Sequence, residues 1–213
     1  MGAGTNGTLP SSIGNFQSIN YMHFWGGIRG TLPSTIGALT RLSFLRFDKC
    51  RFSGTIPSII GALTKLSFLK LAPSEFTGTI PSTISALKSL TDLFLYANHL
   101  TGTIPSFIST LTSLRYLDLG LNSFTGIIPS SFLALKSLND LYLDENSLIG
   151  TIPSVITAST SLRTLVLGKN SLTGTIPSGI SELRYLNEFR PRSRYLNDVN
   201  VLIKLGIVPV KWL

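Results

Sequence analysis

Cysteine and charged residues are both scarce in this sequence. A single cysteine, Cys50, among 213 residues excludes a disulfide within the chain and a metal site built from cysteines. Charged residues make up only 13% and hydrophobic residues 43%, which excludes intrinsic disorder and allows a continuous apolar core. The formal net charge is +8, and half of this surplus falls within residues 184–213, which indicates a basic tail more than a basic binding face.

Targeting, membrane-spanning and common catalytic motifs are also missing. The N-terminus has neither the cationic start nor the apolar run of a secretory signal. The most apolar stretch, 199–213, is interrupted by Lys204, Pro209 and Lys211 and is too short to cross a bilayer. We find no phosphate-binding loop with its lysine, no nucleophile elbow and no kinase catalytic sequence. We therefore expect a non-enzymatic protein with no cofactor, no nucleic-acid partner and no membrane span in this chain.

Proline reveals an internal repeat. Seven prolines follow one another at intervals of 24 residues, each after Ile or Leu and before Ser: Pro33, Pro57, Pro81, Pro105, Pro129, Pro153 and Pro177. A fixed period of this length is typical of a solenoid, in which stacked coils bury a shared core that no single coil could form.

A leucine pattern, Leu-x-x-Leu-x-Leu, precedes most of these prolines in the same phase. Its clearest copies begin at Leu66, Leu90, Leu114, Leu138 and Leu162. In the last part of the pattern the leucines alternate with other residues, so that one face of an extended segment points inward. Each of about seven or eight coils should therefore contribute one short parallel strand.

The residues after each strand predict how the chain turns. Asparagine recurs three positions after the last leucine, at Asn98, Asn122, Asn146 and Asn170, while Ser74 and Cys50 hold this place in earlier coils. A buried asparagine can pair with the backbone groups that a turn leaves unsatisfied, so we expect a hydrogen-bonded ladder through the solenoid, with Cys50 as a small buried substitute. Ser159 interrupts a column of leucines and predicts a locally looser coil.

These residues resemble the plant-type (extracellular) leucine-rich-repeat consensus, Leu-x-x-Leu-x-Leu-x-x-Asn-x-Leu-x-Gly-x-Ile-Pro, over roughly residues 6–189. The sequence is similar to polygalacturonase-inhibiting proteins and to the ectodomains of receptor-like kinases and receptor-like proteins. The resemblance implies an α/β repeat solenoid, mostly β and irregular. The implied form is a right-handed superhelix with a parallel concave sheet. We expect the solenoid to occupy 1–189 and a divergent basic cap or tail to occupy 190–213.

Some features of such ectodomains are missing from the sequence. Signal peptides and cysteine-paired caps usually accompany these repeats, and their absence suggests a fragment or a partial gene product. Localisation outside the cell or at its surface is therefore implied by the resemblance alone, with Asn6-Gly7-Thr8 as a single match to the glycosylation pattern.

Variable residues between the leucines are the candidates for function, because they should face outward from the concave sheet. Exposed aromatic side chains supply contact area at small entropic cost, and flanking charges orient a partner. Aromatic residues that merely pair across strands are the alternative. We predict a recognition module that binds a protein, peptide or cell-wall glycan, with inhibition of a glycan hydrolase as a special case. The predicted binding residues are Phe68, Lys70, Phe94, Tyr96, Tyr116, Asp118, Tyr142 and Asp144.

A metal site and a catalytic site are two other possible functions of the concave face. Asp118, Asp140 and Asp144 could hold a divalent ion or act as a catalytic pair, but an open sheet offers no closed pocket to desolvate them. We therefore predict no catalytic, cofactor-binding or metal-binding residues. His23 and His99 are interpreted as isolated surface residues.

A repeated Thr-x-Thr element suggests an alternative function. Outward threonines in stacked rows are suited to binding ice, whereas the repeat consensus itself already favours threonine beside this glycine as ordinary edge structure. The residues that would carry ice binding are Thr77, Thr79, Thr101, Thr103, Thr173 and Thr175.

Overall fold

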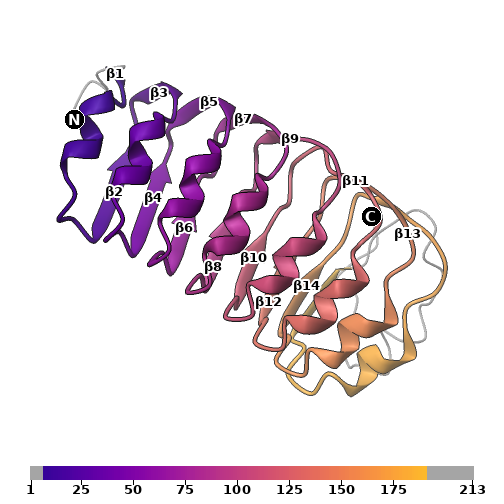
Figure 1. Cartoon of the computed structure of the whole chain (residues 1–213). Helices are drawn as coiled ribbons and strands as arrows, with labels where there is room; N and C mark the ends of the chain where they lie inside the picture. Colours follow the sequence, from indigo (N-terminus) through magenta and orange to yellow (C-terminus); the bar gives the residue numbers. More distant parts are fainter. Residues whose placement is uncertain (1–6, 191–213) are drawn as a thin grey trace.

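The computed structural model describes residues 7–190, which form a curved stack of eight coils (Figure 1). Each coil places one strand in a long parallel sheet and one 3₁₀ helix on the opposite side. The predicted α/β repeat solenoid, mostly β and irregular, is confirmed. The predicted boundary between 1–189 and 190–213 stays a prediction, because residues 191–213 lie outside the described part of the chain.

The concave sheet contains eight parallel strands in the described residues. Adjacent coils pair leucine with leucine, as in Leu45↔Leu69, Leu69↔Leu93 and Leu117↔Leu141, so one face of every strand points into the core. The strands in spatial order are β2 (Tyr21–Trp25), β4 (Phe44–Asp48), β6 (Phe68–Lys70), β8 (Asp92–Phe94), β10 (Tyr116–Asp118), β12 (Asp140–Tyr142), β14 (Thr164–Val166) and β16 (Glu188–Arg190).

A second set of parallel strands forms along a side of the solenoid. A single bridge between Thr103 and Thr125 links its five-stranded and three-stranded parts. The first part contains β1 (Gly7–Thr8), β3 (Ile28–Thr31), β5 (Arg51–Thr55), β7 (Glu75–Gly78) and β9 (His99–Leu100). The second contains β11 (Thr125–Gly126), β13 (Ser147–Gly150) and β15 (Ser171–Leu172).

Proline starts each 3₁₀ helix, as its fixed backbone angle allows. In the second coil, Ile36 N–H donates to Pro33 O at 3.0 Å and closes the first turn, and the same bond recurs in the other coils. The helices are η1 (Ser11–Asn15), η2 (Ser34–Ala38), η3 (Ser58–Ala62), η4 (Ser82–Ala86), η5 (Ser106–Thr110), η6 (Ser130–Ala134), η7 (Ser154–Ala158) and η8 (Ser178–Glu182). Within residues 7–190, none of the helices has the length and apolar character that crossing a bilayer requires.

The asparagine ladder is confirmed. Asn122 Nδ2 donates to the carbonyl oxygens of Leu95, Leu119 and Gly120 at 3.0–3.1 Å, and its Oδ1 accepts from Leu100 N at 3.1 Å. One side chain therefore satisfies the backbone of two adjacent coils, which ties each turn to the next.

Two predicted substitutions within the core columns have different outcomes. Cys50 is buried and its Sγ lies 3.5 Å from Asp48 O, which confirms its structural role. Ser159 does not loosen its coil: it is 5% exposed, and its hydroxyl lies 3.2 Å from both Leu135 O and Leu138 O. Hydrogen bonds to the preceding coil replace the apolar contact that a leucine would make there.

Candidate ligand-binding face

Six aromatic rings form a continuous stack on the concave sheet, which we call the aromatic ladder. Successive ring centroids lie 4.4–5.3 Å apart, within the range of favourable aromatic pairs. The ladder consists of Tyr21, Phe44, Phe68, Phe94, Tyr116 and Tyr142.

In the middle coils, carboxylates lie between the aromatic residues in each row of cross-strand partners. Phe44 and Phe68 are direct cross-strand partners. On the next strand, the cross-strand partner of Phe68 is Asp92, and the ring that Phe68 contacts is that of Phe94, two residues further along. Tyr116 lies directly opposite Asp92, so that Phe68, Asp92 and Tyr116 form a first row across the strands. In a second row, Asp118 lies between Phe94 and Tyr142. Aromatic and acidic side chains therefore alternate over β8, β10 and β12 in both rows.

The orientation of the rings restricts what the ladder can contact. The planes of Tyr21 and Phe44 differ by 9°, and those of Phe44 and Phe68 by 12°, with centroids 4.4 Å apart in both pairs. Rings that stack in this way from neighbouring strands turn their faces towards each other. The edges of these three rings are therefore left for a partner, whereas the rings from Phe94 to Tyr142 are inclined by 29–40° to their neighbours.

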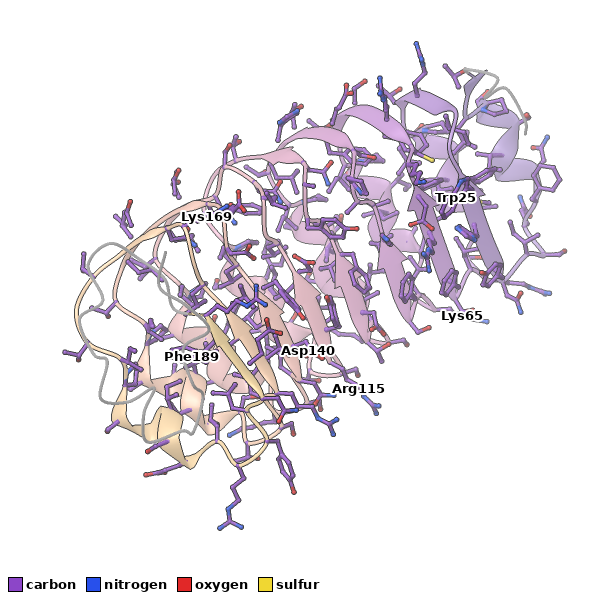
Figure 2. All side chains as sticks on the ribbon, turned by 180° about the vertical axis from the view of Figure 1, so that it is seen from behind. Trp25, Lys65, Arg115, Asp140, Lys169 and Phe189 are labelled. Atoms are coloured by element: carbon purple, nitrogen blue, oxygen red, sulfur yellow. The ribbon has the colours of Figure 1, made fainter. Side chains whose placement is uncertain are left out.

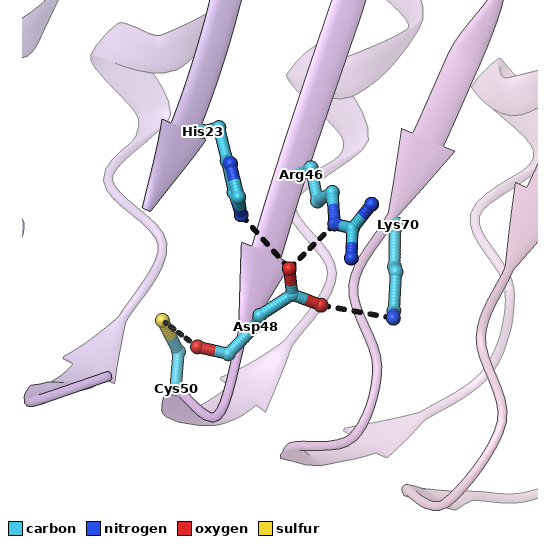
Figure 3. Close-up of polar contacts among 5 residues, drawn as sticks. All are labelled: His23, Arg46, Asp48, Cys50 and Lys70. Atoms are coloured by element: carbon cyan, nitrogen blue, oxygen red, sulfur yellow. Dashed lines mark hydrogen bonds and ion pairs between the residues drawn. The ribbon is translucent and has the colours of Figure 1, made fainter. Parts of the chain in front are cut away.

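A buried carboxylate, Asp48, organises the basic end of the face (Figure 3). Asp48 Oδ2 lies 2.8 Å from His23 Nε2 and 2.5 Å from Arg46 Nε, and its Oδ1 lies 2.9 Å from Lys70 Nζ. Burial alone would raise the pKa of Asp48, but hydrogen bonds from Arg46, Lys70 and His23 outweigh this effect and hold the pKa well below its usual range. Asp48 is therefore ionised and fixes the basic side chains around it.

Lys70 joins this cluster to the ladder. Its Nζ lies 5.9 Å from the ring centroid of Phe94 and 5.6 Å from that of Tyr96, within reach of cation–π attraction. Lys49 Nζ lies 4.8 Å from the ring of Trp25, which is 65% exposed at the first coil. The basic side chains of the early coils are thus held against aromatic rings.

The acidic end of the face is organised around Gly120. A Cβ atom at this position would lie 2.8 Å from Asp144 Oδ1 and 3.3 Å from Asp118 Oδ1, so a larger residue would displace these carboxylates. Burial raises the pKa of Asp118 to about 6, and the nearby charge of Asp144 adds to the shift. The pKa of Asp144 is also raised by burial and by Glu145. Burial and Asp118 likewise raise the pKa of Tyr116, whose hydroxyl stays neutral.

Asp118→Asn is expected to stabilise the protein at neutral pH. Because the folded pKa of Asp118 exceeds its unfolded value of about 3.9, folding binds a proton, and stability falls as the pH rises from about 4 through 6. The side chain is partly exposed, so we expect the variant to gain about 1–2 kcal/mol over the wild type at pH 7.5. Urea unfolding at pH 7.5 and pH 4.5 measures this difference. An equal gain at both values would contradict the raised pKa.

The eight predicted binding residues all lie half-buried on this face. The structure brings Lys70, Phe94 and Tyr96 together, and it brings Tyr116, Asp118 and Tyr142 together; whether they bind a partner stays a prediction. One expectation was wrong: His23 is not isolated, since it contacts the carboxylate of Asp48. In residues 7–190, no group of three or more His, Cys, Asp or Glu side chains is placed to hold a metal ion.

The six threonines proposed for ice binding are all exposed along the second set of strands. Two kinds of contact within the solenoid also account for threonine there. The methyl group of Thr79 lies 2.9 Å from where Gly102, at φ +81°, would carry a Cβ, and the hydroxyl of Thr101 lies 3.4 Å from Gly78 O. Neighbouring strands pair at an offset of 22 residues, as in Thr77↔His99, so threonines of equivalent position do not lie directly opposite each other.

Fold and face together define a parallel-stranded repeat solenoid that displays an ordered array of side chains on an open sheet. The leucine-rich-repeat family profiles match residues 88–148 and 161–183. Comparison with curated protein sequences finds no match.

Solved structures give a broader comparison. The ectodomain of the Arabidopsis thaliana membrane receptor kinase GASSHO1/SCHENGEN3, in complex with CASPARIAN STRIP INTEGRITY FACTOR 2, is 30% identical with a TM-score of 0.88, over 94% of this chain and 24% of the receptor chain. The ectodomain of the Arabidopsis receptor kinase HAESA, in complex with an N-terminally extended IDA peptide hormone, is 35% identical with a TM-score of 0.82, over 88% of this chain and 32% of that chain. A plant ice-binding protein is 28% identical with a TM-score of 0.72, over 88% and 68% of the two chains.

The chain contains leucine-rich repeats similar to those of plant receptor-kinase ectodomains. It spans about a quarter to a third of the length of the two receptor ectodomains.

Proposed function

We propose that this protein is a non-enzymatic recognition module, acting outside the cell, that binds an extended peptide across its concave sheet. The observation that carries the proposal is the aromatic ladder with carboxylates interleaved over β8, β10 and β12. Half-buried rings in a continuous row supply apolar contact area, and the charges beside them fix the orientation of a partner. Similarity to two receptor ectodomains solved with their ligands supports a role of this kind.

A peptide suits the ladder better than a glycan does. Sugar rings pack against the faces of aromatic rings, and here Tyr21, Phe44 and Phe68 stack face to face on each other. The exposed ring edges and the tyrosine hydroxyls can contact apolar side chains and backbone groups of an extended segment. The carboxylates at Asp118 and Asp144 add preference for a basic residue in that segment.

The test uses a displayed library of random peptides selected on the wild-type protein. For the selected peptides we expect Tyr96→Ala/Tyr116→Ala to weaken binding at least ~100-fold, because each of the two central aromatic contacts should contribute ~1.4 kcal/mol or more. Isothermal titration calorimetry measures the affinities.

A matched control replaces two exposed aromatic residues outside the concave sheet. Phe16 and Tyr185 are 57% and 61% exposed, and Phe16→Ala/Tyr185→Ala should leave peptide affinity within about twofold, as is usual away from a binding hot spot. Thermal unfolding of both variants verifies that they fold. If the two double variants bind the selected peptides equally well, the part of the concave face around Tyr96 and Tyr116 is not the binding site.

Ice binding is a second candidate, favoured by the similarity to a plant ice-binding protein over two thirds of that protein's length. If the exposed threonines bind ice, the wild type should inhibit ice recrystallisation, and Thr79→Tyr/Thr103→Tyr should abolish the effect by disturbing a flat surface. Microscopy of annealed ice grains measures it. A wild-type protein that leaves grain growth unchanged at all concentrations would remove this candidate.

A further inference from the structure

Seven consecutive loops carry one basic residue each along one rim of the solenoid. Each loop has five residues, runs from a 3₁₀ helix to a concave strand, and contains one lysine or arginine and no acidic residue. The loops are 39–43, 63–67, 87–91, 111–115, 135–139, 159–163 and 183–187. The basic residues, which we call the basic rim, are Arg41, Lys65, Lys88, Arg115, Lys136, Arg163 and Arg184.

The regular placement of these charges exceeds what composition alone would give. Lysine and arginine number 18 in the chain and acidic residues 10, yet these loops hold seven of the former and none of the latter. The corresponding loop of the first coil, 16–20, has no basic residue, so the repeat consensus does not require one. Figure 2 shows Lys65 and Arg115 extending from the same edge of the concave sheet.

The basic side chains of the rim are exposed and form no ion pairs within the described residues. Four other basic side chains near the concave face differ: Arg46 and Lys70 are paired with Asp48, Lys169 with Glu145, and Arg190 with Glu188. The unpaired like charges give the rim a positive potential, which is reduced where an acidic residue directly follows a loop, at Asp92, Asp140 and Glu188.

We propose that the basic rim binds a linear acidic polysaccharide lying along the solenoid axis. Coils repeat at about 4.8 Å, so the seven charges span about 30 Å with one charge per coil. A polysaccharide with a carboxylate or sulfate on successive sugars presents its charges at regular intervals along an extended chain and can meet several coils together. This surface is separate from the aromatic ladder and requires no peptide.

The test compares two double variants that remove the same charge. Arg115→Gln/Lys136→Gln lies in the rim, and Arg29→Gln/Arg51→Gln removes two exposed, unpaired arginines from the second set of strands. The probes are a polyuronate oligomer, a sulfated oligosaccharide and a neutral oligosaccharide, each long enough to span the seven coils. Calorimetry at low and physiological salt gives the affinities, and the full chain is used throughout.

We expect the wild type to bind an acidic oligosaccharide, with an affinity that rises with oligomer length and falls with salt, and not to bind the neutral one. The rim variant should weaken binding about tenfold and the control less than about twofold, since each exposed ionic contact contributes up to ~1 kcal/mol. The polyuronate and the sulfated probe distinguish the two possible acidic groups. Tyr96→Ala/Tyr116→Ala should bind the acidic probe as the wild type does.

Three results would overturn the proposal. Equal weakening in both double variants would show attraction by net charge alone. Absence of binding to both acidic probes would remove the ligand class. Tighter binding to double-stranded DNA or to anionic lipid vesicles than to either oligosaccharide, with the same loss in the rim variant, would assign the rim to another polyanion.

Discussion

Asn122→Leu should destabilise the protein by about 3 kcal/mol, because it leaves buried backbone groups of two coils without hydrogen-bond partners. The amide of Leu100 loses its acceptor, and the carbonyls of Leu95 and Leu119 lose a donor, while the apolar replacement is similar in size. Urea unfolding followed by circular dichroism measures the change in the free energy of unfolding.

Asn187 provides the matched control for this substitution. It is exposed, and its side chain makes no hydrogen bond within residues 7–190, so Asn187→Leu should change stability by less than about 0.5 kcal/mol. A loss for Asn122→Leu no larger than this would show that the asparagine ladder does not hold the coils together.

Asp48→Ala should lower the free energy of unfolding by about 2–4 kcal/mol at pH 7. The substitution leaves Lys70, whose side chain is only 15% exposed, and Arg46 without their counter-charge. Glu145→Gln is the matched control, because it breaks the ion pair with Lys169, whose side chain is 72% exposed; such pairs contribute at most ~1 kcal/mol.

The same carboxylate predicts how this effect depends on pH. The folded pKa of Asp48 lies below its unfolded value of about 3.9, so its contribution is fully present above that value and is lost as the pH falls below it. The difference between wild type and Asp48→Ala should therefore shrink on acidification. A difference that stays constant down to the acid transition would show that Asp48 acts by packing and not by charge.

The repeat predicts most of the fold because the same few positions recur with the same physical task in each coil. Prolines at intervals of 24 residues mark the start of the 3₁₀ helices, and leucine alternation marks the buried face of each concave strand. The asparagine ladder could also be predicted, since a turn that repeats must satisfy the same backbone groups every time.

Contacts between variable positions could not be predicted in the same way. His23 and Arg46 are cross-strand neighbours, but Asp48 lies two residues further along the strand, opposite Trp25, and the register does not show that its carboxylate reaches both of them. The leucine pattern predicts a looser coil at Ser159. The pattern does not show that the Ser159 hydroxyl can reach two carbonyl oxygens of the preceding coil.

The diagonal course of the aromatic ladder and the position of the basic rim could not be predicted from the sequence either. Phe94 is two residues further along its strand than Phe68, so the stack follows a diagonal that register alone does not give. The seven rim residues occupy different positions within their loops, which hides them from a search for a fixed period. The distribution of net charge along the chain indicates a basic segment at residues 184–213. The rim can be recognised only when the loops are aligned in space.

Fluorine NMR of the protein labelled with 3-fluorotyrosine tests the concave binding face most directly. The chain has six tyrosines, and single Tyr→Phe variants assign their resonances. On addition of a selected peptide, the signals of Tyr96, Tyr116 and Tyr142 should shift in a saturable way, while that of Tyr185, in a loop outside the sheet, should not. A shift confined to Tyr185, or none at the three concave tyrosines despite tight binding, would contradict recognition by the concave face.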